Sequence, residues 1–371
     1  MDGVAERLLR IDWDFSDVNG SNGIHGVHPY PAKFIPDIPA NLIDNLPIPK
    51  GTAIFDPFCG SGVTLVEAQR RGIPSIGIDL NPIACLISKV KTSNLPDNYM
   101  EIVNSCILHA QTNKEFTIPK IPNLDHWYKK PIQKSIAPLL HEIRRYKDPK
   151  LRDFLMLGLS SILVRISNQE SNTRYAAVNN TVQGIDVYNY FQAACRNIAL
   201  KVPKTETKLA YVNILNQDIL ETRADQIKYP IGALITSPPY PNAYEYWLYH
   251  KYRMWWLGYD PLEVKKKEIG ARAHFFKKNP HTKNSFSEQM RGMFGLVHKI
   301  LIPKGYACFV IGRSIIKGEK IDNGKIIIDT AREYGLKHIL TISRNINHKR
   351  KSFNLSHAKI NKEEIVILQK G

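Results

Sequence analysis

The chain has 371 residues, of which 43% are hydrophobic and 23% charged, as in a globular protein with a sizeable core. Its 51 Lys and Arg against 34 Asp and Glu give a formal net charge of +17, which favours a polyanionic partner such as nucleic acid. The basic residues gather in two stretches interleaved with aromatic residues or His: Lys265 to Lys267, Arg272, Lys277 and Lys278, and then Arg344, Lys349, Arg350 and Lys351.

Composition also argues against several classes of protein. The five cysteines are widely spaced, with neither a CxxC pair nor a His cluster at zinc-ligand spacing, which predicts reduced thiols and no metal site. The first 17 residues carry acids and no apolar core, and no later stretch is long and apolar enough to span a bilayer. We therefore expect a cytoplasmic protein without a membrane partner.

Taken in chain order, the first structured stretch is proline-rich. Pro29, Pro31 and Pro36 predict an extended segment, and the apolar pattern from Ile38 to Ile43 predicts a helix after it.

A strand, a glycine turn and a helix follow. The strand ends in Asp56, the turn reads Asp56-Pro-Phe-Cys-Gly60-Ser-Gly62, and the helix runs from Val63 to Gly72. Glycines let the backbone approach a ligand closely, and the helix N-terminus behind them favours negative charge. The chain has no GxxxxGK[ST], which disfavours a nucleoside triphosphatase, and the FxGxG spacing differs from the dinucleotide GxGxxG.

The second strand, Ser75 to Asp79, ends in an acid. In a nucleotide-binding βαβ unit an acid at this place accepts hydrogen bonds from ribose hydroxyls. Asp79 could instead be a turn residue or a cap for the helix opened by Asn81-Pro82, but the glycine turn in register with it favours the ribose ligand.

Residues 94–205 have no glycine-rich turns and show helical periodicity at 132–146, 151–166 and 190–200. We expect a mainly helical insertion. Between its helices, residues 167–180 are rich in amide, hydroxyl and Arg174 side chains that can pair with base edges or phosphates, although an ordinary polar surface loop is the alternative.

The most informative stretch is the apolar strand that runs into Thr236-Ser237-Pro238-Pro239-Tyr240, after an earlier strand that ends at Asp218. The two prolines stiffen the backbone and remove N–H donors, so carbonyl acceptors stand beside a flat ring. A planar base with an exocyclic amino group fits this arrangement, with Tyr240 stacked on its face.

The remainder predicts an aromatic helix over 242–257, in which Tyr244 or Tyr246 lies near the base, and a mobile basic stretch over 258–284 suited to phosphate contacts. A helix over 294–301 closed by Pro303-Lys304-Gly305, a strand over 306–312, a helix over 327–334 and strands over 336–342 and 365–369 complete the pattern. The alternation of strand and helix indicates a parallel α/β sheet.

Thr236 to Tyr240 resembles the catalytic motif of the prokaryotic DNA amino-methyltransferases of restriction-modification systems, which methylate cytosine N4 or adenine N6 with S-adenosylmethionine. His28 through Phe34, Asp56 to Gly62 and Asp79 match further motifs of that family, and the glycine turn precedes the catalytic strand, as in its non-permuted members. The resemblance covers most of residues 24–95 and 206–369. It implies a Rossmann-like S-adenosylmethionine-dependent methyltransferase sheet whose final strand is reversed.

The resemblance also assigns roles to residues. Catalysis falls to Ser237, Pro238, Pro239 and Tyr240. The cofactor would be bound by His28, Tyr30, Lys33, Asp56, Phe58, Gly60, Gly62, Asp79, Asn81 and Asp218. Arg174, Lys265, Lys266, Lys267, Arg272, Lys277 and Arg350 are expected to contact DNA. Residues 1–93 and 206–371 would form the catalytic domain, and 94–205 the insertion that reads the target.

We therefore expect an enzyme that flips a base out of double-stranded DNA and methylates its amino group directly, without a cysteine nucleophile, in the prokaryotic cytoplasm and associated with the nucleoid. A Ser at position 237 favours cytosine N4, because Asp or Asn usually accompanies adenine N6 in the resembled enzymes; adenine N6 remains the alternative. An RNA or protein-glutamine methyltransferase, which usually shows Asn-Pro-Pro-Tyr, and an inactive DNA-binding module are remoter. A cognate restriction endonuclease is a further partner that the resemblance suggests without deciding.

Overall fold

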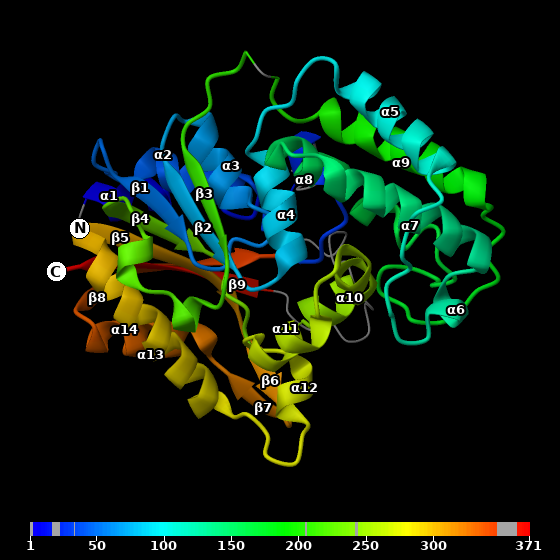
Figure 1. Cartoon of the computed structure of the whole chain (residues 1–371). Helices are drawn as coiled ribbons and strands as arrows, with labels where there is room; N and C mark the ends of the chain where they lie inside the picture. Colours follow the sequence, from blue (N-terminus) through cyan, green and yellow to red (C-terminus); the bar gives the residue numbers. More distant parts are fainter. Residues whose placement is uncertain (1–2, 17–22, 33, 205, 242–243, 347–361) are drawn as a thin grey trace.

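A seven-stranded sheet in the order β3-β2-β1-β4-β5-β9-β8 forms the centre of the computed structural model (Figure 1). The structure describes residues 3–16, 23–32, 34–204, 206–241, 244–346 and 362–371. The strands of the sheet are β1 (Ala53–Asp56), β2 (Ser75–Asp79), β3 (Val212–Asn216), β4 (Ile231–Thr236), β5 (Leu301–Gly312), β8 (Leu336–Asn345) and β9 (Lys362–Lys370). The strands from β3 to β5 pair in parallel, and β9 pairs antiparallel with both β5 and β8, which confirms the reversed final strand.

Helices cover both faces of the sheet and extend beyond one end of it (Figure 1). They are α1 (Gly3–Leu9), α2 (Asp37–Asn45), α3 (Val63–Arg70), α4 (Pro82–Lys91), α5 (Tyr99–Thr112), α6 (Leu124–Trp127), α7 (Lys130–Arg145), α8 (Pro149–Ile162), α9 (Gly184–Ala199), α10 (Tyr246–Leu257), α11 (Pro261–Lys267), α12 (Arg272–Phe275), α13 (Lys283–Ile300) and α14 (Asn323–Glu333). Short 3-10 turns, η1 (Gly23–Gly26), η2 (Ile219–Glu221) and η3 (Ala224–Gln226), and a hairpin of β6 (Ser314–Ile316) and β7 (Glu319–Ile321) complete the fold.

The strands are apolar on both sides because both faces of the sheet are covered. Successive residues of a strand point to opposite faces, so Ile54 packs in the core with α1 and α2 while Phe55 packs in the core with α13 and α14. This accounts for strands that read as continuous hydrophobic runs, and it confirms the α/β class predicted from the sequence.

The described residues between α4 and β3 form helices α5 to α9. Phe154 and Phe191 of this segment share one core with Ile83 of α4 and Trp256 of α10. The segment is therefore packed onto the helices beside the sheet, as Figure 1 also shows. Its role as a separate target-recognition region stays a prediction.

The stretch expected to be mobile, 258–284, is instead partly helical. Asp260 accepts a hydrogen bond from the Leu262 backbone N–H at 2.8 Å and so caps α11, and α12 follows. Asp260 followed by Pro261 is a helix-start signal in the sequence, and the prediction overlooked it because it rested on the basic composition of the stretch.

Two further boundaries differ from expectation. Helix α13 begins at Lys283, where Thr282 caps it, well before Phe294. Strand β5 begins at Leu301 and includes Pro303 and Gly305. The pairing with β4 shifts register between Leu301 and Tyr306, so the residues between them are not paired with β4. A proline, which has no N–H to donate, is tolerated there.

Among the described residues, no helix has the length and apolar character needed to cross a membrane, and no group of three or more His, Cys, Asp or Glu side chains could hold a metal ion. The five cysteines are buried and free.

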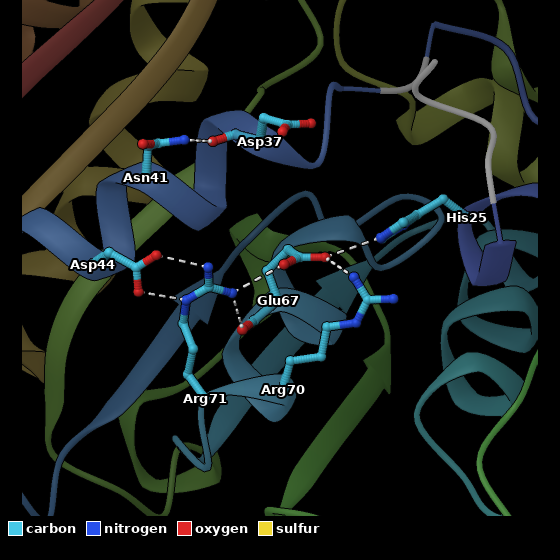
Figure 2. Close-up of polar contacts among 7 residues, drawn as sticks. All are labelled: His25, Asp37, Asn41, Asp44, Glu67, Arg70 and Arg71. Atoms are coloured by element: carbon cyan, nitrogen blue, oxygen red, sulfur yellow. Dashed lines mark hydrogen bonds and ion pairs between the residues drawn. The ribbon is translucent and has the colours of Figure 1, made fainter. Parts of the chain in front are cut away.

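A buried carboxylate fixes α3 against its neighbours. Figure 2 shows Arg71 between Glu67 of α3 and Asp44 of α2, while His25 of η1 and Arg70 also contact Glu67. The Glu67 side chain is 6% exposed and that of Asp44 is 54% exposed. Burial alone would raise the pKa of Glu67, but the hydrogen bonds to His25 and Arg71 and the charge of Arg70 outweigh it and lower the pKa. Helix α3 follows the glycine turn, so this network also holds that turn in place.

We predict that Glu67→Gln lowers the free energy of unfolding by about 1 to 3 kcal/mol, because buried donors lose a charged acceptor. The contribution of a carboxylate with a lowered folded-state pKa is present above its unfolded pKa, about 4.3, and disappears as the pH falls through the folded value. The difference between wild type and variant in urea unfolding should therefore narrow below about pH 4.

Asp44→Asn is the matched control, because it removes an exposed partner of the same arginine and should cost less than about 1 kcal/mol. Equal losses in the two variants, or a difference that persists to about pH 3, would contradict this account.

Candidate active site

A cavity of about 270 Å³ lies at the carboxyl ends of β1, β2 and β4. Parallel α/β sheets bind ligands at this edge, where the strand order reverses between β1 and β4. The cavity brings together most of the residues that the sequence singled out, from segments far apart in the chain. Those that line it are Tyr30, Asp56, Phe58, Gly60, Asp79, Asn81, Asp218, Ser237, Pro238, Pro239 and Tyr240.

Two glycines of the glycine turn, Gly60 and Gly62, have left-handed backbone conformations and closely packed neighbours. Gly60 has φ +49°, and a Cβ there would lie 3.2 Å from the Tyr30 hydroxyl. Gly62 has φ +74°, and a Cβ there would lie 2.6 Å from Ser88 Oγ on α4. Gly60 is therefore required on the cavity side, whereas Gly62, which does not line the cavity, is required for packing against α4.

Asp79 holds this turn to the end of β2. Its carboxylate accepts hydrogen bonds from the backbone N–H groups of Gly60 and Asn81, each at 2.8 Å. Burial raises the pKa of Asp79 to about 6, although the two backbone hydrogen bonds oppose the rise. A carboxylate has about four acceptor positions, so Asp79 retains capacity for hydroxyl donors of a ligand.

Asp56 connects the glycine turn to the proline motif. It is buried and accepts hydrogen bonds from Thr236 Oγ1 at 2.6 Å and from the Phe58 backbone N–H at 3.2 Å. Burial raises the pKa of Asp56 to about 6, against the effect of these hydrogen bonds. The ends of β1 and β4 are thereby held side by side.

Ser237 presents an acceptor to the cavity. Its hydroxyl donates to the Val310 carbonyl at 3.0 Å, so its oxygen lone pairs are available to an incoming N–H group. Tyr240 lines the same cavity and is half-buried.

An aromatic series forms one wall. Tyr30 stacks on Tyr246 with ring centroids 5.7 Å apart, and Tyr246 lies 5.6 Å from Tyr244. Both residues expected near the base, Tyr244 and Tyr246, line the cavity.

The remaining predicted cofactor residues differ in their surroundings. His28 is buried outside the cavity lining, where Ser160 Oγ lies 3.0 Å from its Nε2. Asp218 lines the cavity and also caps η2 through the Leu220 backbone N–H at 2.9 Å. Asn81 likewise caps α4 through the Ile83 N–H at 3.0 Å. Lys33 falls outside the described residues.

Some of the residues predicted to contact DNA are exposed, and others are paired with acids. Arg174, Arg272 and Lys277 are exposed. Lys267 lines the cavity and pairs with Glu221, and Lys266 pairs with Glu263.

Lys265 lies over the Trp247 ring at 4.8 Å. Arg350, with Lys349 and Lys351, falls outside the described residues. Arg344, expected on a basic surface, is instead buried, because it is bonded to the N-terminal segment and to Glu363.

Sequence reasoning did not identify Glu268 and Gly270. The Glu268 carboxylate accepts from the backbone N–H groups of Tyr246 and Trp247 at 2.9 and 2.7 Å, so it caps α10, and burial raises its pKa to about 8. Gly270 has φ +75°, and a Cβ there would lie 2.7 Å from the Tyr240 carbonyl oxygen. The segment Glu268-Ile269-Gly270, which follows a run of lysines, is the signal that the sequence offers for this turn.

Comparisons with known proteins find similarity to DNA methyltransferases. A family model described as DNA methylase, N6_N4_Mtase, matches residues 5–90. The chain is 21% identical to the type II methyltransferase M.MvaI of Kocuria varians, over 91% of this chain and 87% of that protein. It is 42% identical to M.MjaII of Methanocaldococcus jannaschii over 22% of this chain and 16% of that protein. With M.BsoBI of Geobacillus stearothermophilus it shares 25% identity over 67% of this chain and 55% of that protein.

We predict that Gly270→Ala destabilises the protein by more than the strain of a left-handed alanine, which is about 1 to 2 kcal/mol. The added methyl group would collide with the Tyr240 carbonyl, and overpacking of this kind costs about 1 to 3 kcal/mol more.

Gly335→Ala separates the two effects. Gly335 has φ +77°, but a Cβ added there would meet no other described atom within 4 Å, so this position carries the strain without the collision. Urea unfolding of both variants is the measurement, and equal losses would show that the Gly270 turn does not press on Tyr240.

Proposed function

We propose that the chain is a DNA amino-methyltransferase of restriction-modification type and that its target is the N4 amino group of cytosine. The family methylates DNA with S-adenosylmethionine, so the cavity has to hold that cofactor beside a flipped base. The observation that carries the cytosine assignment is Ser237, whose hydroxyl donates to Val310 and leaves its oxygen as an acceptor in the cavity. In the resembled enzymes a Ser at this place usually accompanies cytosine N4.

The residues around the glycine turn fit the cofactor. Gly60 has φ +49°, and a Cβ there would approach the Tyr30 hydroxyl to 3.2 Å, so a side chain at this position would be strained and would crowd the cavity lining. Asp79 has acceptor capacity for the ribose hydroxyls, and Tyr30 and Phe58 supply apolar surface in the same cavity. When bound, S-adenosylmethionine supplies an electrophilic methyl group on a sulfonium sulfur.

The catalytic segment orients the target amino group. Ser237 Oγ and the Pro238 carbonyl accept its two hydrogens, and Tyr240 stacks on the ring, so that the nitrogen lone pair turns toward the methyl carbon. Held by these acceptors, the amino nitrogen would take the methyl group that bound S-adenosylmethionine supplies, and its surplus proton would leave for water. Positioning and electrostatics supply the acceleration, and no side chain is alkylated.

Exposed basic residues would contact the DNA backbone. Arg272 and Lys277 come after helix α11, whose last residue, Lys267, lines the cavity. Arg174 lies in the polar loop between α8 and α9. We propose that these three residues contact phosphates or bases, and that Lys265, Lys266 and Lys267 also contact the DNA backbone.

The base assignment predicts a single product. DNA methylated by the purified protein and digested to nucleosides should contain N4-methylcytosine by mass spectrometry, because Ser237 accepts from that amino group. N6-methyladenine in its place would refute the cytosine assignment and leave the adenine alternative. A protein that binds the cofactor but yields neither product would support the inactive DNA-binding module.

The raised pKa of Asp79 leads us to expect that cofactor binding depends on pH. Its pKa is raised to about 6, and its ionised form is the acceptor for ribose hydroxyls, so the affinity for S-adenosylmethionine should weaken as the pH falls below about 6. Asp79→Asn should bind about 10- to 100-fold more weakly at about pH 7.5, with a shallower pH dependence, because a charged hydrogen-bond acceptor is lost. Calorimetry measures both effects.

Asp153→Asn serves as the control. Asp153 is also a carboxyl whose pKa burial raises, but it lies on α8 outside the cavity lining, so its replacement should leave the affinity unchanged. Unchanged affinity in a folded Asp79→Asn protein would remove Asp79 from the cofactor site.

A further inference from the structure

An ion pair that the catalytic motif does not include closes the cavity on the far side of β5. Arg344 at the end of β8 and Glu363 at the start of β9 are opposite each other in the ladder and are joined by a hydrogen bond. The Arg344 side chain is 3% exposed and that of Glu363 is 22% exposed. Both residues line the same cavity as Ser237 and Tyr240. A cation this deeply buried is costly unless it is paired and hydrogen-bonded, so a structural or ligand-binding role is expected for Arg344.

The hydrogen bonds of Arg344 leave part of its donor capacity unused. Nε donates to the Trp13 carbonyl at 2.8 Å, Nη1 donates to Glu363 Oε2, and Nη2 donates to the Asp14 carbonyl at 3.3 Å. A guanidinium has five N–H groups, so one hydrogen on each terminal nitrogen has no acceptor among the described residues. Two neighbouring buried donors at a cavity wall match a ligand with two neighbouring acceptors.

The sheet sets the distance between this pair and Ser237. Ser237 follows β4 and donates to Val310 of β5, and Gly312 of β5 pairs with Glu363 of β9. Glu363 on β9 therefore lies two strand spacings from β4, about 10 Å, and Arg344 on β8 lies three, about 14 Å, with its guanidinium hydrogen-bonded back to Glu363 at the cavity wall. A pyrimidine ring with a hydrogen bond of about 2.9 Å on each side spans about 10 Å, which is comparable with the separation of β4 from the strand that carries Glu363.

The Tyr240 ring, on which the base would stack, lines the same cavity as Arg344 and Glu363. Burial, and after it the negative charge of Glu363, raises the pKa of Tyr240.

We propose that Arg344 is a specificity-determining residue that donates to N3 and O2 of the flipped cytosine, with Glu363 holding it in place. The inference rests on the proposed function, because it assumes that the amino group lies at Ser237. Next to its amino group cytosine presents two adjacent acceptors, N3 and O2, whereas adenine presents N1 followed by a C–H group. A guanidinium fork therefore selects cytosine.

Glu363 has a second effect in this arrangement. An uncompensated guanidinium at N3 and O2 would draw the N4 lone pair into the ring and make the nitrogen a poorer nucleophile. The carboxylate of Glu363 keeps the pair neutral, so Glu363→Gln should lower kcat more than it weakens DNA binding.

The test uses the full-length protein and a duplex carrying its recognition sequence, which is read from the methylated DNA of the wild type. The target base is either cytosine or 3-deazacytosine, which has a C–H group in place of N3. Wild type should lose about 10- to 100-fold in kcat/KM on the analogue, because one good base contact is worth about that much. Arg344→Met should lose a similar factor on cytosine and almost nothing further on the analogue.

Asp14→Ala controls for the structural role of Arg344. Asp14 accepts two hydrogen bonds from Asn345, at 2.6 and 2.8 Å, so its loss loosens the same N-terminal segment without altering the cavity lining. This variant should keep the wild-type preference for cytosine over the analogue. If Arg344→Met does not fold, Glu363→Gln is measured instead: it should lower kcat more than it weakens DNA binding, and an unchanged kcat would contradict the role given to the pair.

The outcomes separate the inference from the function on which it rests. N4-methylcytosine formation at the wild-type rate by a folded Arg344→Met protein, or additive losses from the variant and the analogue, would overturn the inference alone. N6-methyladenine from the wild type would overturn both the cytosine assignment and the role of Arg344.

Discussion

The hydrogen bond from Thr236 to the buried carboxylate of Asp56 joins the two motifs on which the site depends. Asp56 ends β1 and begins the glycine turn, and Thr236 ends β4 and begins the proline motif. The motifs are distant in sequence but adjacent in the sheet, because β1 and β4 are parallel neighbours. The cavity lies at the carboxyl ends of these strands, where the connections leave on opposite sides and make room for a ligand.

The chemistry of the cavity is that of buried acids in a strongly basic protein. Burial raises the pKa of Asp56 and Asp79 to about 6 and that of Glu268 to about 8. Each of the three carboxylates accepts a backbone N–H, so each also fixes a turn or the start of a helix. The acids that would meet the cofactor therefore serve the fold as well, whereas positive charge predominates over the chain as a whole and suits DNA.

The environment of Arg344 shows why a count of charges is a weak guide to a binding surface. The residue stands in a basic stretch of sequence, yet its guanidinium is buried against Glu363 and the backbone of the N-terminal segment. A side chain that sequence composition assigns to the DNA backbone thus lies at the wall of the cavity instead. Lys266 and Lys267 are also paired with acids, so their charges are partly compensated before DNA arrives.

The sequence by itself determined the α/β class, the glycine turn, the acid at the end of β2 and the proline motif at the end of β4, because these depend on local backbone requirements and on the periodicity of apolar residues. It also indicated the family, since several spaced motifs occurred in one order. It did not reveal that Gly270 lies against Tyr240, that Glu268 caps α10, or that Arg344 and Glu363 close the cavity. Those contacts join residues from different strands and turns, so only the tertiary structure, which sets the strand order and register, could decide them.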